Sequence, residues 1–168
     1  SVAMRFAKEG AAVVVTSTDG KTAEVVADEI VCDGGRAVAL ACDVVQFEQC
    51  EEVAAKTAEA YGGHIDILVN NAGAFSGPEG GGTARPFDKW EIEDWDHIVD
   101  VNLRGMWFCV RAVYPYMKPQ GYGKIINVSS TTVWKGLSMM VPYVASKAGV
   151  IGLTRSLARA LGPDGITV

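Results

Sequence analysis

Two kinds of segment alternate along the chain, and this alternation most constrains how it can fold. Short runs rich in Val, Ile and Ala are typical of buried strands: residues 12–16, 37–41, 65–69, 124–128 and a fifth run from Ile166. Between them lie segments with apolar residues at helical spacing: residues 22–31, 48–61, 94–117 and 142–161. Buried strands joined through helices form a parallel sheet covered on both faces. We therefore predict an α/β fold, a doubly wound parallel sheet in three α/β/α layers, as a single domain over residues 1–168.

Composition and charge exclude several classes of function. Of the 168 residues 49% are hydrophobic, enough for a sizeable core, and the net charge is -5. Nucleic-acid binding requires a basic field, so we expect no nucleic-acid partner. No apolar run approaches the roughly 18 residues of a membrane span, and the first residues do not resemble a signal peptide, so we expect no membrane partner and a cytoplasmic protein. The four cysteines and two histidines lack ligand or disulfide spacing, which predicts free, mostly buried thiols and no metal.

Small polar residues follow the predicted strands, at the edge where a parallel sheet of this kind binds its ligand. They are Ser17, Thr18 and Asp19 after the first strand, Asp43 after the second, Asn70–Gly73 after the third and Ser129–Ser130 after the fourth. The chain contains only four asparagines, so an adjacent pair directly after a strand marks residues 70–73 as a binding loop.

A tyrosine and a lysine lie one helical turn apart in the segment that begins at Pro142, a residue suited to a first helical turn. Tyr143 and Lys147 are at i and i+4, so they share one helix face. A phenol titrates near pH 10 in water, too high for an acid or base at neutrality, and a nearby ammonium favours the phenolate. The pair is therefore a candidate for proton transfer, although this spacing alone is a weak signal.

Asn102 falls inside an apolar stripe of the segment 94–117. The stripe comprises Trp95, Ile98, Val99, Met106, Cys109 and Val113. A buried amide costs free energy unless its hydrogen bonds are satisfied. Two interpretations stay open: a structural asparagine that bonds a neighbouring backbone, or a member of a functional site.

Taken together, these motifs resemble the short-chain dehydrogenase/reductase family over essentially the whole chain. The resemblance lies in four stretches: Asn70-Asn-Ala-Gly73, Val101-Asn-Leu-Arg-Gly105, Ile126-Asn-Val-Ser-Ser130 and Tyr143-Val-Ala-Ser-Lys147. Their order and spacing agree with the family, including the thirteen positions from Ser130 to Tyr143.

The resemblance implies a role for each matching residue. Tyr143 would be the general acid/base, and Lys147 would favour its phenolate and bond the nicotinamide ribose. Ser130 would polarise the substrate carbonyl. Asn102 would hold a water that relays protons from Lys147. The remaining residues with an implied cofactor contact are Asp43 at the adenine, Val44 beside it, and Asn71, Ala72 and Gly73 near the adenosine.

The sequence departs from the family pattern at both ends. The family's Thr-Gly-x-x-x-Gly-x-Gly turn is absent, and Ile166-Thr-Val168 stops where a further segment normally follows. We expect an internal portion of a longer protein, with a sheet incomplete at both ends. The absent strand would leave a gap between the strands at 12–16 and 65–69 and two unpaired apolar edges, and the pyrophosphate would lose its helix N-terminus. Our hypothesis is that this chain alone is inactive while its parent is active.

The strand-end residues also bear on the choice of cofactor. Family members that use NAD usually carry an acid where this chain has Ser17, followed by Thr18. Hydroxyls can bond a 2′-phosphate, which favours NADP(H) over NAD(H), although Asp19 could reach the ribose if the turn shifts.

The expected substrate is a small-molecule ketone or secondary alcohol. A 3-oxoacyl reductase and a secondary-alcohol dehydrogenase for aromatic, steroid or sugar substrates stay open, as does a non-catalytic dinucleotide-binding scaffold. The glycine-rich loop after residue 74 is interpreted as a mobile wall of the substrate pocket. The resemblance further implies a homo-oligomer, a dimer or tetramer, joined through residues 94–117 and 142–161.

Overall fold

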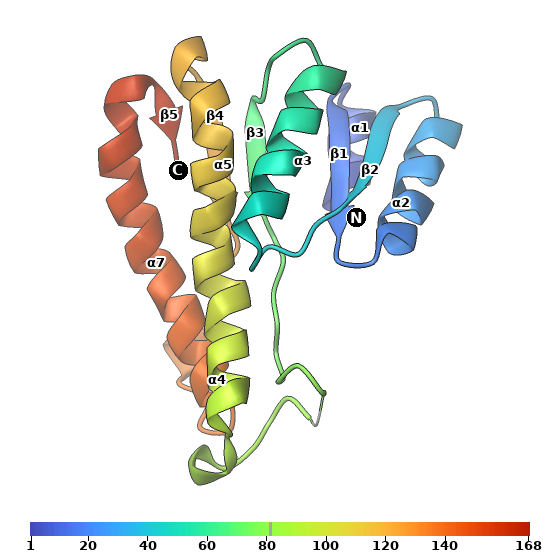
Figure 1. Ribbon diagram of the computed structural model, residues 1–168. Coiled ribbons are helices and arrows are strands. Elements are labelled where there is room, and N and C mark those ends of the chain that lie inside the picture. Colours follow the sequence, from blue (N-terminus) through green and yellow to red (C-terminus); the bar gives the residue numbers. More distant parts are fainter. Residues whose placement is uncertain (81) are drawn as a thin grey trace.

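The computed structural model describes residues 1–80 and 82–168, so Gly81 of the glycine-rich loop lies outside the described residues. The predicted alternation of strands and helices is confirmed (Figure 1). In chain order the helices and strands are α1 (Val2–Lys8), β1 (Ala12–Ser17), α2 (Gly20–Cys32), β2 (Arg36–Ala41), α3 (Phe47–Ala60), β3 (Ile67–Asn70), α4 (Ile92–Val99), α5 (Gly105–Gln120), β4 (Gly123–Asn127), α6 (Thr132–Lys135), α7 (Val141–Leu161) and β5 (Ile166–Thr167).

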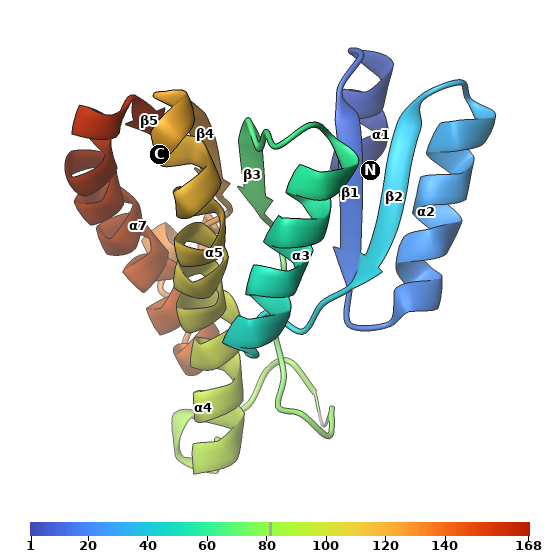
Figure 2. The same cartoon turned by 45° about the horizontal axis from the view of Figure 1, so that its top comes forward.

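The strands form two separate parallel sheets in the part of the chain that the structure describes. β1 pairs with β2, with Val13 opposite Ala37, and β3, β4 and β5 pair in that order. Figure 2 shows the two groups of strands side by side, with no ladder between β1 and β3. The predicted gap is therefore confirmed, and one edge each of β1 and β3 has no described strand partner.

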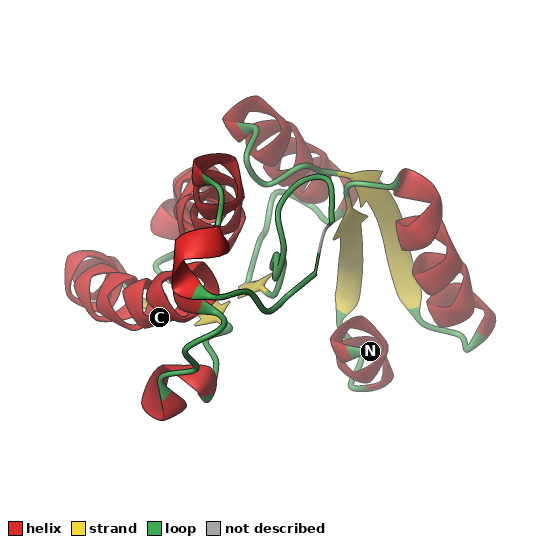
Figure 3. Cartoon of the chain, turned by 90° about the horizontal axis from the view of Figure 1, so that it is seen from below, coloured by secondary structure: helices red, strands yellow, loops and turns green. Residues whose placement is uncertain are grey.

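Helices cover both faces of the strands, as a doubly wound fold requires. Figure 3 shows α1 and α3 on opposite sides of the β1–β2 pair. α3 packs against α5, and α5 in turn packs on β3 and β4. The largest cluster of buried apolar side chains lies between these elements and includes Cys50, Ala54, Val110, Val113, Met117, Ile125 and Ile166. Burial of this surface on folding is the main source of stability for such a layer.

One local expectation is corrected by the structure, and two further local features were not predicted. The segment 94–117 is not one continuous helix, because a π-helical turn over Asp100–Arg104 separates α4 from α5. The short helix α6 was not predicted, since four residues carry no periodic pattern. The amphipathic helix at the start of the chain has a cap: the Ser1 side chain accepts a hydrogen bond from the Met4 amide at 3.3 Å.

Candidate active site

The carboxyl ends of the strands all point downward in Figure 1, towards the side on which α4 lies, and this is the edge where the sequence predicts binding. A hollow of about 370 Å³ opens there beside β3 and β4. It is lined by Asn71, Ala72, Gly73, Phe75, Val128, Ser129, Tyr143 and Lys147. The structure thus brings together six of the residues singled out from the sequence: Asn71, Ala72 and Gly73 after β3, Ser129 after β4, and Tyr143 and Lys147 in α7. Ser130 and Asn102 lie next to these residues without lining the hollow.

Lys147 is held in place by the strand-end backbone of β4. Its ammonium donates a hydrogen bond to the Val128 carbonyl oxygen at 2.8 Å, and the Ser129 hydroxyl donates to the Lys147 carbonyl oxygen at 2.8 Å. Only 3% of the residue is exposed, and this burial lowers the pKa of the Lys147 ammonium below its usual value. The structure therefore places a desolvated cation in the hollow.

Tyr143 lies one turn before Lys147 in α7, with its aromatic ring 5.9 Å from the Lys147 Nζ atom (ring centroid). Pro142 occupies the first turn of this helix, as expected. The phenol ring stacks on the ring of Phe75 at a centroid distance of 4.9 Å and an interplanar angle of 29°. Sequence reasoning missed Phe75. The only signal was its place, directly after the loop 70–73 and Ala74.

Asn102 lies in the π-helical turn and is completely buried. Its Oδ1 atom accepts a hydrogen bond from the Ala74 amide at 2.7 Å, and its Nδ2 atom donates to the Ala74 carbonyl oxygen at 2.9 Å and to the Ser146 hydroxyl at 3.0 Å. These contacts agree with one of the two interpretations left open, in which Asn102 is a structural amide that bonds a neighbouring backbone. Both amide hydrogens are committed, so a relay water would need another atom of this residue.

Ser130 follows β4 and lies two residues before α6, whose N-cap is Thr131. Its Oγ atom accepts hydrogen bonds from the Thr132 amide at 3.2 Å and from the Thr132 hydroxyl at 2.9 Å. These bonds use oxygen lone pairs, so the hydroxyl hydrogen of Ser130 can still be donated to a substrate oxygen.

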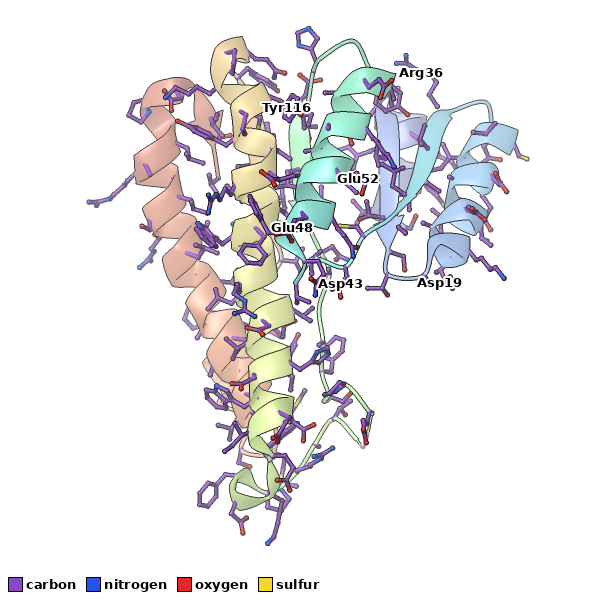
Figure 4. The ribbon with its side chains drawn as sticks, in the orientation of Figure 1. Asp19, Arg36, Asp43, Glu48, Glu52 and Tyr116 are labelled. Carbon is purple, nitrogen blue, oxygen red and sulfur yellow. The ribbon has the colours of Figure 1, made fainter. Side chains whose placement is uncertain are left out.

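Asp43 and Val44 lie in the turn that joins β2 to α3, and Figure 4 shows Asp43 near the lower end of α3, on the same side as Asp19. The Asp43 carboxylate accepts the Val45 amide at 3.2 Å, and the Asp43 amide donates to the Gln49 side chain at 2.8 Å. Val44 packs on Gly105, where an added Cβ would lie 2.8 Å from a Val44 methyl carbon. This turn is fixed beside the start of α5.

Ser17 ends β1 and Thr18 follows it, exposed at the same edge. Asp19 is committed elsewhere, because it caps α2. One carboxylate oxygen accepts the Lys21 amide at 3.1 Å and the other accepts the Thr22 hydroxyl at 2.8 Å. The sequence left open that Asp19 could reach a ribose, and the cap accounts for both of its oxygens instead.

The glycine-rich loop is anchored by Arg85. The Arg85 guanidinium forms an ion pair with Asp94 of α4 and lies 5.1 Å from the centre of the Trp90 ring. Its backbone amide donates to the Met139 carbonyl oxygen at 2.8 Å, which joins the loop to the segment that precedes Tyr143.

Three of the four cysteines gather beneath the turn that carries Asp43. The sulfur atoms of Cys50 and Cys109 are 3.9 Å apart. The neighbouring Cys50 thiol raises the pKa of Cys42 above its usual range, and the contact with Cys109 raises the pKa of Cys50 to about 12. All four cysteines are free thiols, as predicted. Residues 1–80 and 82–168 contain no group of three side chains that could hold a metal ion.

None of the described helices is long and apolar enough to cross a membrane.

Comparison with known proteins places this geometry in a family. The family model described as short chain dehydrogenase matches residues 1–168. The (2S)-[(R)-hydroxy(phenyl)methyl]succinyl-CoA dehydrogenase subunit of Thauera aromatica is 39% identical over 166 residues, 99% of this chain and 63% of that protein. The 3-oxoacyl-[acyl-carrier-protein] reductase of Staphylococcus epidermidis is 36% identical over 169 residues, 100% of this chain and 66% of that protein. The chain thus spans about two thirds or less of the length of these relatives.

Solved structures agree with the family model. A metagenomic short-chain oxidoreductase in complex with NADP has a TM-score of 0.88 at 32% identity, over 98% of this chain and 72% of that one. An NAD⁺-bound xylitol dehydrogenase has a TM-score of 0.91 at 29% identity, over 99% of this chain and 61% of that one. The chain belongs to the short-chain dehydrogenase family.

Proposed function

We propose that the protein is an NAD(P)(H)-dependent oxidoreductase that interconverts a ketone and a secondary alcohol. The observation that carries this proposal is the placement of Tyr143 and the desolvated Lys147 ammonium in the wall of one hollow at the binding edge. A non-catalytic scaffold does not need a buried cation there, and a buried charge is costly to keep.

The lining of the hollow fits a bound dinucleotide. Gly73 lets the loop backbone approach Asn102 and Lys147 closely, since a Cβ at this position would lie 3.2 Å from Asn102 Oδ1 and 3.7 Å from Lys147 Nζ. The cofactor, when bound, supplies or accepts the hydride. Lys147 would hold its nicotinamide ribose, residues 71–73 would lie near its adenosine side, and Asp43 and Val44 would lie at its adenine.

The side chains of this chain would manage the proton. In the reducing direction the Ser130 hydroxyl donates a hydrogen bond to the substrate carbonyl oxygen. The Tyr143 hydroxyl gives its proton to that oxygen as the hydride arrives at carbon, and the ketone becomes an alcohol. The Lys147 cation stabilises the phenolate that remains. In the oxidising direction the phenolate takes the proton back.

The cofactor is proposed to be NADP(H) in preference to NAD(H). The hydroxyls of Ser17 and Thr18 lie at the end of β1, and the nearest carboxylate, that of Asp19, is committed to the cap of α2. No acid therefore occupies the last position of the strand, and the Asp19 carboxylate, which keeps its charge, is held by the cap of α2. The likeness to the NADP complex supports this choice, while the likeness to the NAD⁺-bound xylitol dehydrogenase keeps NAD(H) as the second candidate.

A 3-oxoacyl substrate is the first candidate, supported by the name of the Staphylococcus epidermidis relative. An aromatic secondary alcohol is the second, since the Thauera aromatica relative is named for a substrate that carries a hydroxy(phenyl)methyl group and Phe75 presents an aromatic ring beside Tyr143. Association into dimers or tetramers stays a prediction.

The test of the proposed function uses the protein expressed from its complete gene. Nicotinamide fluorescence follows titrations with NADPH and NADH, and turnover is then measured on 3-oxoacyl thioesters and aryl ketones. We expect NADPH to bind at least about tenfold more tightly, and a Ser17→Asp variant to reverse the order because its carboxylate repels the 2′-phosphate. Thr16→Asp is the matched control, since successive residues of β1 face opposite sides of the sheet. Tight binding without turnover of any ketone would instead support the scaffold.

A further inference from the structure

A closed circuit of contacts connects the loop after β3 to the backbone and to the ring of Tyr143. One half runs through hydrogen bonds from Ala74 to Asn102, from Asn102 to Ser146 and from Ser146 to Tyr143. The other half runs through the ring of Phe75, which follows Ala74 in the chain and stacks on Tyr143. The loop therefore contacts the proposed acid/base from two sides.

The hydrogen-bonded half of the circuit is buried and has little freedom. Asn102 holds both polar backbone atoms of Ala74, at 2.7 and 2.9 Å, in the way that a neighbouring strand would. Asn102 is 0% and Ser146 2% exposed, so water cannot easily replace a lost partner. A movement of the loop would therefore be transmitted to Ser146.

The Ser146 hydroxyl connects Asn102 in the π-helical turn to Tyr143 in α7. This hydroxyl accepts the last amide hydrogen of Asn102 at 3.0 Å and donates to the Tyr143 carbonyl oxygen at 2.8 Å, three residues earlier in α7. A serine that bonds back within its helix adjusts the local helix geometry. Here that bond acts on the turn that carries the phenol and, one residue later, Lys147.

We propose that Ser146 is a positioning residue that couples the loop 71–75 to Tyr143 and so sets the proton-transfer geometry. The proposal rests on the proposed function, because it assigns Tyr143 the proton transfer. It adds a buried residue that is not among those lining the hollow. Its effect on turnover comes through the turn of α7 alone.

The experiment compares Ser146→Ala with Ser156→Ala, an exposed serine on the same helix, in the protein expressed from its complete gene. Loss of the Ser146 hydroxyl should lower kcat about 10- to 100-fold, the scale expected when a reacting group is displaced by about 1 Å. The dissociation constant of NADPH and the KM for the ketone should change by less than about twofold, because no binding contact is removed. Ser156→Ala should leave all three constants unchanged, and Ser146→Thr, which keeps the hydroxyl, should recover most of the lost rate.

Hydrogen exchange supplies a second measurement that does not depend on activity. The Ala74 amide should exchange faster in Ser146→Ala, since Asn102 loses the partner that holds its side chain, and it should be unaffected in Ser156→Ala. If Ser146→Ala does not fold, Ser146→Cys, with a similar size and a poor donor, takes its place.

The outcomes separate this inference from the proposed function. A native kcat and native exchange at Ala74 in a folded Ser146→Ala variant would overturn the inference while Tyr143→Phe still abolished turnover. Full turnover by Tyr143→Phe would overturn the proposed function itself. A rise in the KM for the ketone with unchanged kcat would show that Ser146 supports substrate binding, and it would also overturn its role in proton transfer.

Discussion

Two tyrosine–lysine pairs with the same spacing occupy different regions of the molecule. Tyr143 and Lys147 lie in α7 at the binding edge, while Tyr114 and Lys118 lie near the end of α5. The two ammonium groups are at similar distances from the rings of their tyrosines, 5.9 and 5.3 Å from the centroids. The spacing i, i+4 therefore accounts for proximity in both pairs.

The surroundings of the two pairs differ in charge and in burial. The Tyr114 hydroxyl donates to the Asp164 carboxylate at 2.7 Å, and Lys118 donates to that hydroxyl at 3.0 Å and lies 3.6 Å from Asp164. The bond to Tyr114 and the charge of Asp164 raise the pKa of the exposed Lys118. Burial lowers the pKa of Lys147, whose ammonium is bonded to the neutral Val128 carbonyl. The same motif is thus a neutralised surface cluster in one place and, in the other, a buried pair at the hollow, where we propose the reaction occurs.

The largest expected difference between the pairs is in turnover after removal of the hydroxyl. In the protein expressed from its complete gene, Tyr143→Phe should lower kcat by about 100- to 10,000-fold, the usual contribution of a general acid. NADPH affinity should be retained, and the matched variant Tyr114→Phe should keep native kinetics. Steady-state rates and nicotinamide fluorescence measure both quantities. Equal rates for the two variants would show that the environment of Tyr143 has no special chemistry.

Removal of the cation should separate the pairs in the same direction. Lys147→Met is expected to lower kcat about 100-fold or more, since it removes the charge that stabilises the phenolate. Lys118→Met should leave kcat unchanged, because its ammonium lies at the far end of α5 from the hollow. A loss of activity in Lys118→Met would contradict the assignment.

The pH dependence of stability should have opposite sign for the two lysines. The desolvation cost of Lys147 is fully present below its lowered pKa and disappears as the pH rises from that value towards 10.5. The stability of the native chain relative to Lys147→Met should therefore rise over that interval. The favourable contribution of Lys118 is present below pH 10.5 and is lost as the pH rises through its raised pKa. The stability of the native chain relative to Lys118→Met should therefore fall over that interval. Urea unfolding at a series of pH values gives both differences.

The smallest expected effect is that of the acid in the surface cluster. Asp164→Asn removes the charge that faces Lys118, and exposed ion pairs contribute little to stability. We expect native kcat and a melting temperature within about 2 °C of the native chain. A fall in turnover would show that the end of α5 is coupled to the hollow.

The strands and the site were largely predictable because their signals are local. Runs such as 12–16 and 124–128 fall within β1 and close to β4, and the tetrad 70–73 marked the loop that lines the hollow. The predicted gap between β1 and β3 followed from the family order of strands and is present in the structure. Residue roles stay predictions, because no bound substrate or cofactor contacts define them.

The parts that sequence reasoning missed depend on contacts between distant segments. The apolar spacing of the segment 94–117 gives no sign of the π-helical turn at Asn102. The hydrogen bonds of Asn102 reach Ala74 and Ser146. The stacking of Phe75 on Tyr143 joins the loop after β3 to α7, and no local period encodes it. The capping role of Asp19 was within reach, since an acid before a helix is a common cap.

The most direct test of the account is a titration of the two lysine ammonium groups by NMR. The ¹³Cε resonances of Lys147 and Lys118 can be assigned with Lys147→Arg and Lys118→Arg variants and followed through alkaline pH. We predict that Lys147 titrates below 10.5 and Lys118 above it, because burial acts on the first and Tyr114 and Asp164 act on the second. Titration of both groups at the same pH, or in the reverse order, would contradict the claim that environment distinguishes the two pairs.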